Sequence, residues 1–163
     1  MIRLPQFALT ARADGTLTGD GSAANPYQIG TADDWETFAA WINTGTHADG
    51  YYKLTADIGT ESDPITAAVG TVTGDQQGVA FAGNFDGGGH GIYVSITNTS
   101  DQGTALFRYI SGATIKNMKV MGMVSGTMHC AGLVGFASGT NTISNCEVAT
   151  EVTCGRGPNR VAV

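Results

Sequence analysis

The sequence predicts an all-β protein, a parallel β-helix (solenoid) with one amphipathic capping helix at its N-terminal end. Three observations predict this fold. A segment in the last third of the chain returns at a fixed interval, short apolar segments alternate with glycine-rich turns, and residues 31–43 alone have helical periodicity. Repetition of this kind indicates stacked supersecondary units, because each unit is too thin to bury its own apolar face.

The N-terminal third contains an arm and the predicted capping helix. Residues 1–30 read as an edge hairpin or an ordered arm, with turn signals at Asp14-Gly15 and at 19–22. In the helix 31–43, Thr31 is the expected N-cap and Asp34 completes a capping box. One apolar stripe is expected to cover the open end of the coil stack, and it consists of Trp35, Phe38, Ala39 and Ile42.

The middle of the chain predicts short strands. Residues 51–58 alternate as one strand, with Tyr52, Leu54, Ala56 and Ile58 on a single face. Residues 59–79 are loop-rich, with Val69 and Val72 as strand anchors. Residues 81–96 give two strands about the turn Gly87-Gly88-Gly89.

The repeat itself is clearest after residue 105. Ile115 recurs as Ile143 and Asn117 recurs as Asn145 at the same interval, whereas Leu106 and Leu133 are one position closer together. We expect the isoleucines to point inward and each asparagine to occupy a corner that needs left-handed backbone angles. Stacking at this interval aligns further pairs: Val120/Val148 and Val124/Val152, with Met118 beside Cys146 inside and Lys119 beside Glu147 outside.

These elements define a single β-helix domain, 1–163. Its parts are an N-terminal arm or strands in 1–30, the capping helix 31–43, the coils 51–152 and an uncapped tail 153–163. Because the tail has no capping pattern, the last coil is expected to expose apolar surface and strand edges. We therefore predict a fragment or N-terminal part of a longer array, a tail that folds over the end, or end-to-end self-association through the C-terminal coil.

Composition excludes several partners. The chain has a net charge of −6, only 13% charged residues, and scattered Arg and Lys, so no nucleic acid partner is expected. No apolar run reaches the ~18 residues of a membrane span, so no membrane insertion is expected. The N-terminus is too short and interrupted for a signal sequence, which predicts either a removed leader or another export route.

Three cysteines, Cys130, Cys146 and Cys154, lie near the C-terminus without a C-x-x-C spacing. An odd number argues against a complete disulfide framework. Three states stay open: buried small hydrophobes, which we favour, a single bridge, or a reactive site.

The chain resembles the GLUG-repeat family of bacterial surface and adhesin-like proteins. The resemblance lies in 132–136 (GLVGF) followed by 143–148 (ISNCEV), in the lead-in 83–92 (GNFDGGGHGI), and in a cap-like start from 25–29 (NPYQI) to 51–58. It spans roughly residues 19–152. It implies a right-handed parallel β-helix in large secreted or surface-anchored proteins, a scaffold rather than an activity.

No residue is assigned as catalytic, cofactor-binding or metal-binding, and the ligand-binding residues are unknown. The triple-glycine turn lacks a P-loop pattern. His129 and Cys130 are strand neighbours that face opposite sides, so they do not form a dyad. His90 is assigned a local hydrogen-bonding role in its turn.

A glycan-cleaving site would need converging carboxylates. The repeats offer Glu147 and Glu151 as acids with Lys116 and Lys119 nearby, and the remaining candidates are turn residues: Asp57, Asp63, Asp75, Asp86 and Asp101. Aromatic platforms for a sugar are conceivable at Tyr51, Tyr93, Tyr109 and Trp41, although we favour packing roles for them.

We therefore expect a non-catalytic extracellular β-helix module of a bacterial surface adhesin-like protein, without cofactor, whose partner is a host glycan or protein. Ligand contacts are expected from loops such as 59–79 and 97–104. The alternatives are a phage or injection-device fibre that recognises a receptor and, less favoured, a glycan-cleaving β-helix enzyme.

Overall fold

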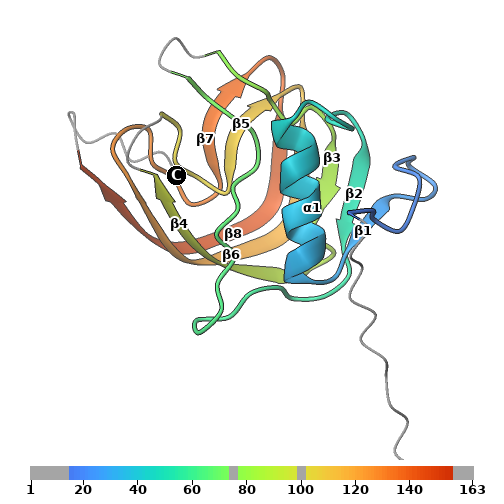
Figure 1. Ribbon diagram of the computed structural model, residues 1–163, viewed down its shortest axis with the longest axis horizontal. Coiled ribbons are helices and arrows are strands. Elements are labelled where there is room, and N and C mark those ends of the chain that lie inside the picture. Colours follow the sequence, from blue (N-terminus) through green and yellow to red (C-terminus); the bar gives the residue numbers. More distant parts are fainter. Residues whose placement is uncertain (1–14, 74–76, 99–101, 156–163) are drawn as a thin grey trace, which may run out of the picture.

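The computed structural model confirms a parallel β-helix with one helix (Figure 1). It describes residues 15–73, 77–98 and 102–155. All pairings between the named strands are parallel. The elements are β1 (Tyr27–Ile29), α1 (Ala32–Asn43), β2 (Tyr51–Leu54), β3 (Asn84–Asp86), β4 (Gly91–Asn98), β5 (Phe107–Ser111), β6 (Thr114–Gly126), β7 (Val134–Ser138) and β8 (Thr142–Cys154).

One vertical column of side chains shows how the coils stack. Tyr27 pairs with Tyr52, which pairs with Phe85, then Ile115, then Ile143. The intervals between these partners are unequal, and the longest separates Tyr52 from Phe85, so the coils differ in length. The prediction that coils begin at residue 51 is therefore wrong, since β1 already forms the first rung. Such a short strand cannot show alternation in a sequence.

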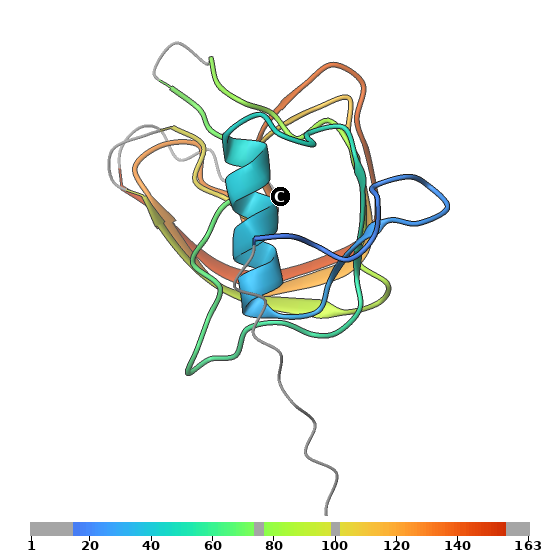
Figure 2. The ribbon, with the colours of Figure 1, turned by 45° about the vertical axis from the view of Figure 1, so that its right-hand side comes forward.

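The helix α1 covers the mouth of the stack, as predicted. In Figure 2 it lies in front of the ring traced by the coils. The Thr31 side chain accepts from the Asp34 N–H and completes the capping box. Phe38, fully buried, contacts the rings of Tyr52, Phe81, Phe85 and Phe107. The Trp35 Nε1 donates to the Ala67 carbonyl oxygen at 2.8 Å, which ties the helix to the second coil.

The segment between β2 and β3 is more ordered than the sequence indicates. The predicted strand 51–58 breaks after Leu54, and Ile58 rejoins the wall through a bridge to Ile92. The loop-rich stretch 59–73 is itself a coil wall, because Ile65 bridges Val94 and Val69 bridges Phe107. Single bridges leave no period-2 pattern in the sequence, which is why the pattern predicts a loop there.

The corner asparagines adopt the predicted left-handed backbone, with φ of 57° at Asn117 and 52° at Asn145. Their amides also form a ladder. Asn145 Nδ2 donates to Asn117 Oδ1 at 2.8 Å, and Asn117 Nδ2 donates to Asp86 Oδ1 at 3.0 Å. The corner is thus held by hydrogen bonds from coil to coil as well as by backbone preference.

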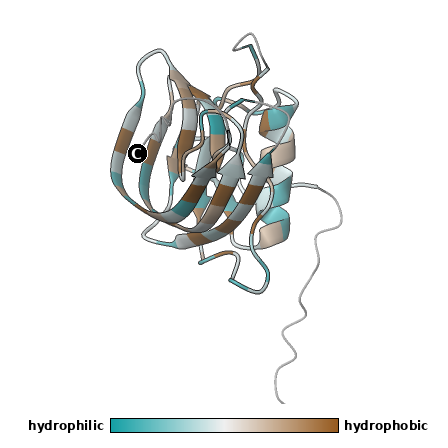
Figure 3. Cartoon of the chain, turned by 90° about the vertical axis from the view of Figure 1, so that its left-hand side faces the viewer, coloured by the Kyte–Doolittle hydropathy of each residue, from teal (hydrophilic) through white to brown (hydrophobic). Residues whose placement is uncertain are grey.

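The last coil differs from the one before it. Along the strands, apolar and polar residues alternate (Figure 3). Ile115 and Val120 are fully buried, whereas their counterparts Ile143 and Val148 are 48% and 39% exposed. Within the described residues no coil lies beyond β8, so its inner side chains lack a neighbouring layer.

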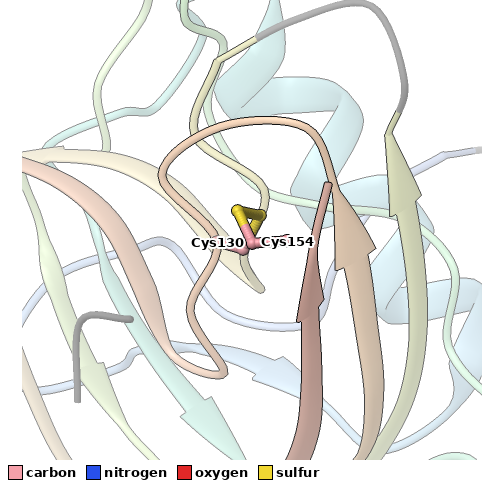
Figure 4. Close-up of a disulfide and its surroundings, with 2 residues drawn as sticks. All are labelled: Cys130 and Cys154. Carbon is pink, nitrogen blue, oxygen red and sulfur yellow. A yellow bond between two sulfur atoms is a disulfide. The ribbon is translucent and has the colours of Figure 1, made fainter. Parts of the chain in front are cut away.

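A disulfide closes the same region. Cys130 and Cys154 are bonded, with their Cα atoms 5.8 Å apart (Figure 4). Cys146 is free. The favoured assignment of buried free thiols is therefore wrong for this pair. β8 also continues to Cys154, so the coil extends past the predicted start of the tail at 153. Residues 156–163 of that tail lie outside the described residues.

Candidate functional site

A groove on the outer wall is the main candidate site. It has a volume of about 410 Å³ and lies where β2, β3 and β6 run side by side, bordered by the turn that precedes β1. Strand side chains alternate, so Tyr52 and Phe85 point into the core and their chain neighbours point outward. The groove residues are Ala23, Pro26, Tyr51, Tyr52, Lys53, Asn84, Phe85, Asp86, Thr114 and Lys116.

The in-register pairing builds two outward columns in this groove. One column runs from Tyr51 through Asn84 to Thr114. The other runs from Lys53 through Asp86 to Lys116, with adjacent strands about 4.8 Å apart. Tyr51 keeps 39% of its surface exposed at one end. An aromatic ring therefore stands beside a column of alternating charges.

Asp86 is fixed at the centre of the charged column. Its Oδ1 accepts from the Gly88 N–H at 2.9 Å and from Asn117 Nδ2, and its Oδ2 lies 3.5 Å from Lys116 Nζ. Partial burial acts to raise the pKa of the Asp86 carboxyl. The hydrogen bonds from Asn117 and Gly88 and the Lys116 ammonium outweigh burial, so the pKa lies below its usual range.

The predicted hydrolase acids do not meet in the structure. Glu147 and Glu151 lie four residues apart on β8, roughly 13 Å along a strand. Glu147 pairs with Lys119 at 2.8 Å, the predicted stacked charge pair. Asp86 is the one carboxylate that lines the groove, and Asp75 and Asp101 lie outside the described residues. A two-carboxylate mechanism needs a pair that this groove does not assemble.

His90 and His129, the two histidines singled out in the sequence, both contact neighbouring side chains. His90 Nδ1 lies 3.3 Å from Asp57 Oδ1, a partner 33 residues earlier in the chain, so this contact links two segments and is not the local one expected within the turn. The Gly91 N–H, which donates to the same carboxylate at 2.8 Å, is the main cause that lowers the pKa of Asp57. His129 packs on the Phe136 ring, and Cys130 is bonded to Cys154.

The other aromatic candidates are packed. Trp41 contacts the rings of Tyr27 and His47, and the Tyr109 hydroxyl lies 3.0 Å from Ser138 Oγ. Tyr93 is half-buried. Tyr51 is the exception, and the sequence does not distinguish it from the rest. Sequence reasoning also missed Lys53, Asn84 and Thr114, because the unequal intervals between their coils hide the register.

Two further observations concern the described residues. Among them there is no group of three or more His, Cys, Asp or Glu that could hold a metal ion. The helix α1 is too short to cross a bilayer, and the described ranges contain no other helix that could. The fold and its outer wall define a capped parallel β-helix module with a solvent-facing groove.

Comparison with known proteins gives a partial similarity. The chain is 27% identical over 166 residues to part of Halomucin from Haloquadratum walsbyi, and the match covers 77% of this chain. It covers only 2% of Halomucin, so the chain corresponds to a small segment of a very long protein. No family model matches the chain. No solved structure matches it either.

Proposed function

We propose that this chain is a non-catalytic, extracellular β-helix module of a bacterial surface protein of the adhesin-like, GLUG-repeat type. In this proposal the coils form a rigid wall that presents the groove to a ligand. The observation that carries the proposal is the groove of about 410 Å³ on the outside of the stack, with an exposed tyrosine at its edge. Its size is that of a small-ligand site.

The disulfide supports an extracellular location. Cys130–Cys154 joins the loop after β6 to the last strand. Such bonds persist in oxidising compartments and are rare where thiols are kept reduced. This favours a secreted module over a fibre assembled in a reducing cytoplasm. The similarity to a segment of Halomucin supports a place as one module within a much longer chain.

The residues that line the groove favour a binding module over an enzyme. The groove contains a single carboxylate, and Asp86 already accepts three contacts. A hydrolase of the two-carboxylate kind would need a second acid across the cleft. The rigid strands beneath the groove instead suit pre-organised binding, which lowers the entropic cost of association.

Binding is tested with the immobilised protein on a panel of host glycans and matrix proteins. We expect at least one member of the panel to bind, and we expect its affinity to fall in the Tyr51→Ala variant. Met123→Ala is the matched control, because Met123 is 51% exposed on β6 and does not line the groove. Equal loss in both variants, or a ligand bound equally by Tyr51→Ala, would contradict a groove-based function.

Location is tested on the protein isolated from its native host without reductant. We expect one thiol, Cys146, to react with an alkylating reagent after denaturation, while Cys130 and Cys154 stay protected. Mass spectrometry counts the labels. Three labelled cysteines would place the protein in a reducing compartment and overturn the extracellular assignment.

The open last coil supports end-to-end association in the same proposal. Within the described residues β8 pairs only with β6, so its outer backbone edge is open, and the apolar side chains of Ile143 and Val148 are exposed on the same coil. Sedimentation equilibrium should show a concentration-dependent dimer that Ile143→Lys weakens about tenfold, because a charge in the interface loses its water. A monomer at all concentrations would remove self-association from the proposal.

A further inference from the structure

We propose that the groove takes an acidic sugar, a hexuronic acid unit of a glycan. The sugar ring stacks on Tyr51 and its carboxylate meets the ammonium group of Lys53. This inference rests on the proposed binding function and narrows its ligand class. The juxtaposition behind it is an exposed aromatic ring and an unpaired cation two residues apart, on the same face of one strand.

Some polar groups in the groove are already engaged and others are free to bind a ligand. Both oxygens of Asp86 are engaged, by Gly88, Asn117 and Lys116. In the described part of the chain, by contrast, the side chains of Lys53 and Asn84 make no hydrogen bond or ion pair. The ammonium is purely a donor and the amide supplies two more N–H groups. The free capacity of the groove therefore favours a ligand rich in acceptors.

The groove carries more positive than negative charge. The protein carries a net charge of −6, yet two of its three lysines, Lys53 and Lys116, line this groove. Asp86 is the only acid among the lining residues, which leaves a local excess of one positive charge. In a chain of net negative charge, this local excess favours an anion at the groove over other ligands.

The size of the groove and the flat ring at its edge also suit a sugar. A volume of about 410 Å³ lies within the range of small-ligand sites and suits a short glycan segment. The Tyr51 ring offers a flat apolar face with little conformational entropy to lose. The stem of Lys53 follows it on the same face, two residues along β2. One ring and one charge at that separation match a sugar ring that carries a carboxylate.

A peptide carboxylate is the less suited occupant. Extended peptides bind at exposed strand edges through backbone hydrogen bonds. In the groove, β3 has neighbours on both sides, β2 and β6, so its backbone groups are already used in the ladder. Only side chains remain for recognition, as in a sugar site.

The experiment is calorimetric titration of the whole chain with oligogalacturonate and with its fully methyl-esterified form, which keeps the rings and removes the charge. We expect millimolar or tighter binding of the acid and at least about tenfold weaker binding of the ester, as for a hydrogen bond to a charged group. Lys53→Gln and Tyr51→Ala should each weaken binding of the acid about tenfold. Lys119→Gln is the matched control, because Lys119 lies farther along β6 than Lys116 and does not line the groove.

Each other outcome overturns the inference. Equal affinity for acid and ester removes the carboxylate contact, and binding that survives Lys53→Gln and Tyr51→Ala places the ligand elsewhere. No binding at millimolar concentration excludes this sugar class. An acidic peptide of the same charge that binds as well would replace the glycan by a peptide. In all these cases the surface-module proposal stands or falls separately, on thiol labelling and the panel screen.

Discussion

The two ends of the coil stack solve the same physical problem differently. At the start, α1 covers the core, and Trp35 and Phe38 are fully buried against the first coils. At the end, Ile143 and Val148 stay largely exposed although they repeat the buried Ile115 and Val120. The end is held instead by the Cys130–Cys154 bond. Burial in a solenoid is therefore a property of the neighbouring layer, because the same residue types are core in one coil and surface in the next.

The largest expected effect concerns the capped start. Phe38→Ala removes a fully buried ring that contacts five other aromatic rings. We expect the free energy of unfolding to fall by about 3–5 kcal/mol. Urea denaturation measures it. Glu36→Ala, on the exposed side of the same helix, should change stability by no more than about 0.5 kcal/mol. Similar losses in both variants would show that the helix does not act as a cap.

A matched pair of substitutions compares the two coils directly. Ile115→Ala should cost about 2–5 kcal/mol, because the side chain is fully buried. Ile143→Ala at the equivalent position should cost under about 1 kcal/mol, since nearly half of that side chain is exposed. The midpoints of urea denaturation give both values. Equal costs would mean that Ile143 is covered in solution.

The disulfide that closes the last coil should contribute slightly less to the free energy of unfolding than the buried side chains above. Replacing Cys130 and Cys154 together by alanine opens a bond that spans 24 residues. A loss of about 3 kcal/mol is expected from the chain-entropy estimate. In the double variant, amide hydrogen exchange should become faster in β8 than in the other strands. Cys146→Ala is the control, because its thiol is free, and a loss there as large as in the double variant would argue against the bridge.

The smallest expected effect is a loss of stability in acid through Asp86, which accepts a hydrogen bond from the corner asparagine Asn117. The pKa of Asp86 is lowered in the folded chain, so the carboxylate contributes stability above its unfolded pKa of about 3.9. That contribution is lost as the pH falls through the lower folded pKa. Asp86→Asn should therefore flatten the fall in thermal midpoint below about pH 4. Asp63→Asn, in an exposed turn, serves as control, and an unchanged acid slope in Asp86→Asn would refute this role.

The sequence predicts those parts of the fold that depend on residues close together in the chain or on a regular repeat. The capping box at Thr31 and the stripe from Trp35 to Ile42 follow from helix periodicity, and the corner asparagines follow from a regular repeat. The early coils escape sequence reasoning because their lengths are unequal and their strands shrink to a few residues or single bridges.

The groove and the disulfide depend on long-range register. Lys53, Asp86 and Lys116 come together only when coils of unequal length are aligned. Cys130 and Cys154 meet because the loop after β6 returns to the end of β8. Neither proximity leaves a pattern in the neighbouring residues, so the sequence leaves the alternatives open.

The central claim is that successive coils lie parallel and in register. The most direct test is a set of NMR Overhauser contacts between backbone protons of β6 and β8. The account predicts contacts between the repeat partners, Ile115 with Ile143 and Val120 with Val148, along the whole ladder. Contacts in which the residue number on β6 rises while that on β8 falls would mean antiparallel strands and would contradict the parallel, in-register arrangement.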